Sequence, residues 1–170
     1  MSPQWATSAI LATAAIMLWA ALSGARDLRA LAVSIDAYKL LPEGAGRGLA
    51  LPLLLAESAS GVLLLLPGMR VAGAVIASAL MLLFIFAIAL NMRRGTTDFD
   101  FDCGCAGSHA LRPGAALLLR NTALLCVLLM AVTMPASSPD VGSVAGAIVL
   151  LLAWCGVNAV IAATQWPHDD

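Results

Sequence analysis

Two cysteines separated by a single glycine, Cys103-Gly104-Cys105, form the most concentrated reactive chemistry in the sequence. Gly104 tolerates the backbone conformations that a very small ring requires, and a strained disulfide is easier to reduce than a relaxed one. The pair is therefore expected to exchange electrons with a partner thiol through a mixed disulfide. Binding of a soft metal ion such as Cu(I) and an inert structural disulfide are the alternatives that this spacing leaves open.

Three further residues are candidates for a role in thiol chemistry. His109 follows Cys103 by six residues and is a candidate acid or base, although a solvated loop histidine is the simpler interpretation. Cys126 and Cys155 fall inside long apolar runs and are expected to be buried there as small apolar side chains.

Two charged residues interrupt the apolar runs. Glu57 and Arg120 stand at similar distances from the starts of their runs, which gives a similar depth of about 10–14 Å at ~1.5 Å per helical residue. Because an unpaired charge at that depth is costly, the two are predicted to pair and clamp their helices together. The alternative is a polar pocket, to which Asn121 would contribute, that supports thiol chemistry or holds a lipid head group.

The elements that position these residues follow from composition. The chain has 170 residues, of which 61% are hydrophobic and 11% charged, whereas a soluble domain carries about 25% charged residues. The expected fold is an all-α, polytopic transmembrane helical bundle of about five spans, forming one membrane domain. The predicted spans cover residues 5–22, 48–66, 71–90, 113–134 and 141–164. A net charge of −1 excludes a basic nucleic-acid-binding protein, and no Cys/His cluster has the spacing of a structural zinc site.

Two segments outside the spans, together with the start of the first span, matter for topology. Residues 25–41 combine apolar positions at helical spacing with charges, which predicts an interfacial amphipathic helix, or equally a short helix packed on the bundle. The loop 92–112 holds the cysteine pair. No Lys or Arg precedes the first apolar run, so that run is expected to be retained as a span rather than cleaved as a signal peptide.

Four short motifs together resemble the methylamine utilisation protein MauE family, and more distantly the DoxX-like membrane proteins. The string Asp102-Cys103-Gly104-Cys105-Ala106-Gly107 is similar to the family's D-C-G-C-F-G signature, with Ala106 where an aromatic residue is usual. The stretch Tyr38-Lys39-Leu40-Leu41-Pro42, the segment from Glu57 through Gly61 to Pro67-Gly68, and Leu119-Arg120-Asn121 match further family segments in order.

This resemblance implies a function in a bacterial inner membrane. MauE-like proteins are thought to act with a membrane-anchored thioredoxin-like protein, MauD, in maturing the disulfide-rich small subunit of methylamine dehydrogenase, a periplasmic enzyme. The expected partners are therefore membrane lipid, a MauD-like protein and that subunit. A non-catalytic scaffold for the partner and a quinone-linked disulfide-generating oxidoreductase are the alternatives. The oxidoreductase alternative requires a bound quinone as its cofactor, and no sequence motif demonstrates a site for a quinone.

The resemblance and the charge distribution disagree about orientation. Seven Lys or Arg residues fall on the side of the membrane that carries the cysteine loop, and one falls on the other. The positive-inside rule would place that loop in the cytoplasm. The periplasmic client implied by the resemblance requires the loop to lie in the periplasm instead. On the strength of the resemblance, we expect a periplasmic cysteine loop.

Overall fold

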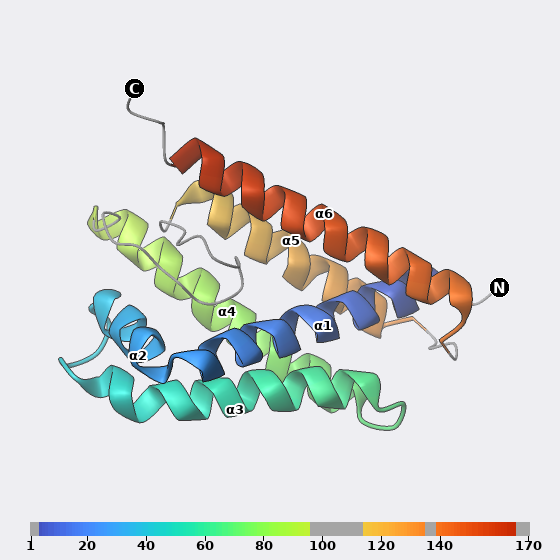
Figure 1. Cartoon of the computed structure of the whole chain (residues 1–170), viewed down its shortest axis with the longest axis horizontal. Coiled ribbons are helices and arrows are strands. Elements are labelled where there is room, and N and C mark those ends of the chain that lie inside the picture. The colour runs from blue at the N-terminus through green and yellow to red at the C-terminus, as the bar shows by residue number, and fades with distance from the viewer. Residues whose placement is uncertain (1–3, 96–113, 135–138, 166–170) are drawn as a thin grey trace.

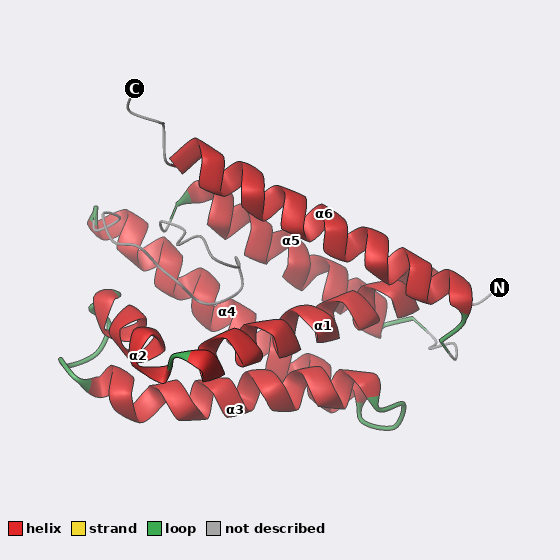
Figure 2. Cartoon of the chain, viewed as in Figure 1, coloured by secondary structure: helices red, strands yellow, loops and turns green. Residues whose placement is uncertain are grey.

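The regular structure of the described residues is entirely helical (Figure 2). The computed structural model describes residues 4–95, 114–134 and 139–165. The helices are α1 (Gln4–Arg26), α2 (Leu28–Ala37), α3 (Ala45–Leu65), α4 (Arg70–Arg94), α5 (Ala115–Val132) and α6 (Val141–Gln165). All except α2 are long and apolar enough to cross a membrane. The predicted all-α bundle of about five spans is confirmed.

The central helix is α1, which packs against α3, α5 and α6 (Figure 1). In its most apolar stretch, 61% of the residues are buried within the chain, compared with 17% for α6. Small side chains make this position possible, because they let neighbouring backbones approach closely. Ala14 and Thr13 are fully buried, for example, and Gly146 of α6 lies directly against Ser8.

The short helix α2 begins at a well-defined cap. The carboxylate of Asp27 accepts the backbone N–H groups of Arg29 and Ala30 at 3.0 and 2.9 Å, which satisfies two donors that the first turn leaves open. Leu31 and Ala32 bury their side chains against α3. The predicted amphipathic segment is thus helical and packed on the bundle.

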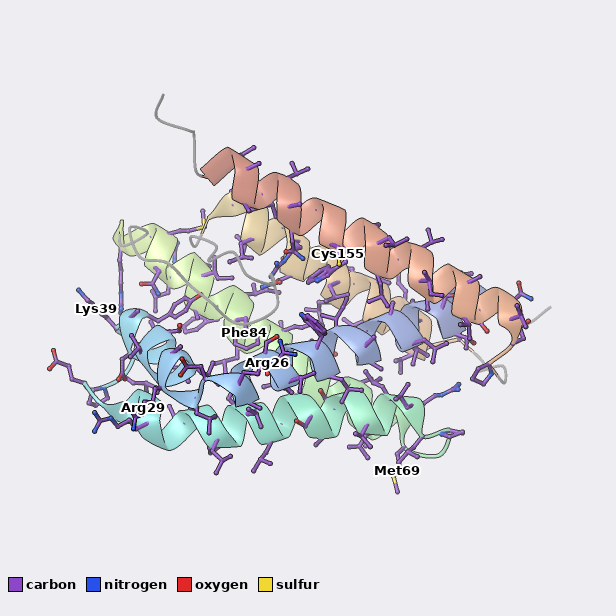
Figure 3. All side chains as sticks on the ribbon, in the orientation of Figure 1. Arg26, Arg29, Lys39, Met69, Phe84 and Cys155 are labelled. Carbon is purple, nitrogen blue, oxygen red and sulfur yellow. The ribbon has the colours of Figure 1, made fainter. Side chains whose placement is uncertain are left out.

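The connections divide between the two ends of the bundle (Figure 1). The N-terminus, the α3–α4 turn and the start of α6 lie at one end, while α2, the end of α4, the start of α5 and the end of α6 lie at the other. We call the latter the basic end, because it carries most of the described cations: Arg26, Arg29, Lys39, Arg47, Arg93 and Arg94. Figure 3 shows Arg29 and Lys39 at this end and Met69 at the opposite one.

Candidate functional site

Arg120 is the cation at the centre of the bundle. It projects from α5, and only 7% of its surface is exposed. Its Nε and Nη2 atoms donate to Oδ1 of Asn121 at 3.3 and 3.1 Å, and Nη1 donates to Oδ1 of Asn158. The guanidinium carbon lies 4.5 Å from the ring centroid of Trp154, within the range of a cation–π contact. Two amides and an aromatic ring therefore hold the guanidinium in one orientation.

Two of the residues that contact Arg120 project from α6. Trp154 and Asn158 are four positions apart, so they lie on the same helix face. The side-chain amide of Asn158 donates to the backbone oxygen of Trp154 at 2.9 Å, which leaves its own oxygen to accept from Arg120. An aromatic residue followed four positions later by an asparagine inside a span was the signal that could have identified this receiving face.

Glu57 lies on the wall of the same cavity as Arg120 and Asn121. Its side chain projects from α3 and is 5% exposed. The cavity, which we call the polar cavity, has a volume of about 30 Å³, and apolar side chains such as Met17 and Met81 form much of the remaining wall. That volume is enough for a water molecule. Glu57 and Arg120, predicted to lie at similar depth, both line this cavity, and their ion pairing stays a prediction.

The helices that carry these two charges have different packing partners. The carboxylate-bearing α3 packs on α1, α2 and α4, while α5 packs on α1 and α4. The charged residues therefore approach one another in the space between α1 and α4. The hydrogen bond from Arg120 to Asn158 ties α5 to α6, which is a different clamp from the predicted one between the second and fourth spans.

Two larger clefts flank the polar cavity. The first, here the α2–α4 cleft, has a volume of about 320 Å³ between α2, α3 and α4, and shares Glu57 and Phe84 with the polar cavity. The second, the α1–α6 cleft, has a volume of about 240 Å³ between α1, α5 and α6, and shares Arg120 and Trp154 with it. The buried charges thus stand at the centre of a row of cavities that crosses the bundle.

The stretch that follows α2 anchors the basic end. The ring of Tyr38 is buried among Ile88, Leu117 and Ile161, which come from α4, α5 and α6. The backbone oxygen of Lys39 accepts from Nη1 of Arg94 at 3.2 Å. This turn is thereby fixed to the last residues of α4, the helix that leads in the chain to the cysteine loop.

The predicted redox residues lie outside the described ranges. Cys103, Gly104, Cys105 and His109 fall between α4 and α5, and their roles stay predictions. The expectation that Cys126 and Cys155 are buried was wrong. Both are free thiols on exposed surfaces of α5 and α6, although both lie within candidate spans (Figure 3 labels Cys155). An apolar run does not reveal which helix faces are covered by neighbours, and the outer faces of a membrane bundle are apolar too.

Comparison with known proteins shows which sequences this chain is similar to. A family profile described as methylamine utilisation protein MauE matches residues 3–134. The chain is also similar to the methylamine utilization protein MauE of Paracoccus denitrificans, with 33% identity over 156 residues. That alignment covers 87% of this chain and 82% of the relative. No solved structure matches the chain.

Proposed function

Because the chain belongs to the MauE family of methylamine utilisation proteins, we propose that it is a membrane thiol–disulfide exchange protein. Its partner is a thioredoxin-like protein of the MauD type, and its client is the small subunit of methylamine dehydrogenase or a related periplasmic enzyme. A thiolate of the reduced partner attacks one sulfur of the Cys103–Cys105 disulfide, and the second partner thiol then resolves the mixed disulfide. The partner leaves as a disulfide, and Cys103 and Cys105 leave as thiols, having taken up two electrons and two protons.

The observation that carries this proposal is the distribution of the four cysteines. By the order of the chain, Cys103 and Cys105 fall between the candidate spans α4 and α5. Cys126 and Cys155 lie within spans, on faces that the bilayer would cover. The proposal therefore assigns exchange to the first pair, because a protein outside the membrane cannot reach thiols that the bilayer covers.

The described helices support the loop that carries the pair. Arg94, at the end of α4, is bonded to the Lys39 carbonyl, and Leu117, in the first turn of α5, is buried beside Tyr38. The two chain segments that enter and leave the loop are therefore packed into the same part of the basic end.

Serine substitutions test the proposal in cells that lack the wild-type chain. Cys103→Ser and Cys105→Ser should each abolish accumulation of mature small subunit with its full set of disulfides, as measured by mass spectrometry. Cys126→Ser and Cys155→Ser are the matched controls and should mature the client normally. Immunoblotting of membranes must show that all four variants accumulate equally.

Two outcomes would contradict the proposal. Normal maturation by both variants of the Cys103–Cys105 pair would exclude thiol exchange at this site. A loss of maturation that only parallels a loss of the protein itself would instead indicate a scaffold, in which the disulfide serves as a structural bond.

A further inference from the structure

The α2–α4 cleft is large enough for a small organic molecule. Its volume of about 320 Å³ lies at the lower edge of the range in which small-molecule sites usually fall, roughly 300–1,000 Å³. Its walls are almost wholly apolar and come from α2, α3, α4 and the turn after α2: Leu31, Ile35, Leu40, Pro52, Leu53 and Leu80. A ligand of this cleft must therefore be largely apolar itself.

The mouth of the cleft faces the lipid. Leu41, Leu49 and Leu83 all line the cleft, yet they are 48%, 40% and 54% exposed. Leu49 and Leu83 belong to candidate spans, whose exposed faces contact the hydrocarbon of the bilayer. A molecule dissolved in the membrane can therefore enter between α3 and α4 without crossing water.

Two polar side chains line this apolar cleft. The phenol of Tyr38 and the carboxyl group of Glu57 belong to residues that are 6% and 5% exposed. A phenol both donates and accepts hydrogen bonds, and a carboxyl group accepts when ionised and donates when protonated. A few polar groups in an apolar wall are the usual means by which a binding site fixes the orientation of its ligand.

We propose that the α2–α4 cleft binds a lipid-soluble quinone, with its ring between α3 and α4 and its oxygens directed to Tyr38 and Glu57. The carbonyl oxygens of a quinone accept from the phenol, and the hydroxyl groups of the reduced form donate to the carboxylate. A phospholipid acyl chain offers neither group, and a fatty acid would set its own carboxylate against Glu57. The site goes beyond the proposed function and does not depend on the cysteines.

Photolabelling of the intact chain in nanodiscs of phosphatidylethanolamine and phosphatidylglycerol tests the site. The probe is an azido derivative of a short-chain ubiquinone, and mass spectrometry locates the modified peptides. Labels are expected on α3 and α4, and an excess of decylubiquinone should remove them, whereas the same excess of palmitic acid should not. Tyr38→Phe keeps the ring volume but loses the hydroxyl group, so it should weaken labelling roughly fivefold.

Cleft-filling variants supply the decisive comparison. Ala56→Phe fills the cleft and Leu83→Trp narrows its mouth, so each should lower labelling about tenfold. Because Leu83 is exposed, its variant tests the site even if the Ala56 variant does not fold. Ala59→Phe is the matched control, since Ala59 is exposed on the same helix and does not line the cleft.

Two results would overturn the proposal. Equal labelling of the Ala59→Phe variant and of both cleft variants would show that the quinone does not occupy the cleft. Displacement of the probe by palmitic acid as effectively as by decylubiquinone would assign the cleft to an acyl chain.

Discussion

Arg120 is a buried cation that connects two helices and an aromatic ring. Its guanidinium group binds Asn121 on its own helix and Asn158 on α6, and it stacks on Trp154. A lysine would keep the charge but could not reproduce these contacts, because it lacks the planar fork of donors. The arrangement explains why an arginine, rather than a generic cation, stands at this depth.

A double-mutant cycle between Arg120 and Asn158 measures that connection. We expect Arg120→Ala and Asn158→Ala each to lower the free energy of unfolding, with a coupling energy of about 0.6–1.7 kcal/mol, as for other hydrogen bonds between membrane helices. Equilibrium unfolding in mixed micelles gives the values. Thr122→Ala is the control, because Thr122 is exposed and bonds only to its own helix at Leu118. A coupling energy of zero would show that the α5–α6 bond contributes no stability.

The hydrogen bonds that Asp140 accepts outside the membrane contribute stability that depends on pH. The Ser143 hydroxyl, and then the Ser143 backbone N–H, donate to its carboxylate and hold the pKa of Asp140 below its usual 3.8. A lowered pKa means that the ionised form stabilises the fold. That contribution is complete above pH 3.8 and is lost as the pH falls through the lower pKa of the folded state.

We therefore expect the thermal midpoint of the wild-type protein to fall more steeply with acidification below pH 3.8 than that of Asp140→Asn. The asparagine can still accept from Ser143 but cannot be protonated in this range. Because Asp140 is exposed, the difference should be small. Differential scanning fluorimetry in detergent measures it, and identical pH profiles for the two proteins would refute the assignment.

Close helix contacts determine the arrangement at the scale of the elements. Gly61 of α3 lies against α1, where a Cβ atom at this position would stand 2.7 Å from Cγ of Leu18 and 3.1 Å from the backbone oxygen of Ala14. Only glycine allows that approach. Gly48, on the same helix, has no such neighbour within 4 Å.

Alanine substitutions at these two glycines should have opposite effects. Gly61→Ala overpacks the α1–α3 contact and should cost about 1–3 kcal/mol of unfolding free energy. Gly48→Ala should be neutral or stabilising by up to about 1 kcal/mol, because alanine is the better helix former. Unfolding of the purified variants compares them directly. Equal effects at the two positions would show that helix propensity, not close packing, governs α3.

The sequence predicted where the helices lie along the chain better than it predicted which helices pack against one another. Apolar runs of span length identified all five long helices because hydrocarbon thickness fixes how many residues a span needs. The same reasoning placed Glu57 and Arg120 at similar depth, and both residues line the polar cavity. It could not identify Asn158 as a partner of Arg120, because depth follows from chain position whereas the facing helix depends on how the bundle packs.

Orientation is the principal question at the scale of the whole molecule. The basic end carries most of the described cations and, by the order of the chain, the cysteine loop as well. The positive-inside rule favours a cytoplasmic basic end. Exchange with a periplasmic partner requires the opposite orientation in the bacterial inner membrane, which we propose.

Labelling of intact cells with a membrane-impermeant maleimide, after mild reduction, decides between these orientations. In a Cys126→Ser, Cys155→Ser background, Cys103 and Cys105 should react without opening the membrane. A reporter, Met69→Cys, added after both loop cysteines are replaced by serine, should react only once the membrane is opened. Met69 is suitable because it is 53% exposed at the end opposite the basic end (Figure 3). The reverse pattern would place the pair in the cytoplasm.

Trapping of the mixed disulfide tests the central claim most directly. Cys103→Ser and Cys105→Ser would each be expressed in the same background, in cells that make the thioredoxin-like partner, and rapidly quenched with acid. In these variants the remaining thiolate attacks the disulfide of the oxidised partner. We predict that at least one variant accumulates the resulting adduct, which dithiothreitol releases, because no neighbouring loop cysteine is left to complete the exchange. Absence of any adduct in both variants, together with normal client maturation by the double variant, would contradict thiol–disulfide exchange by this protein.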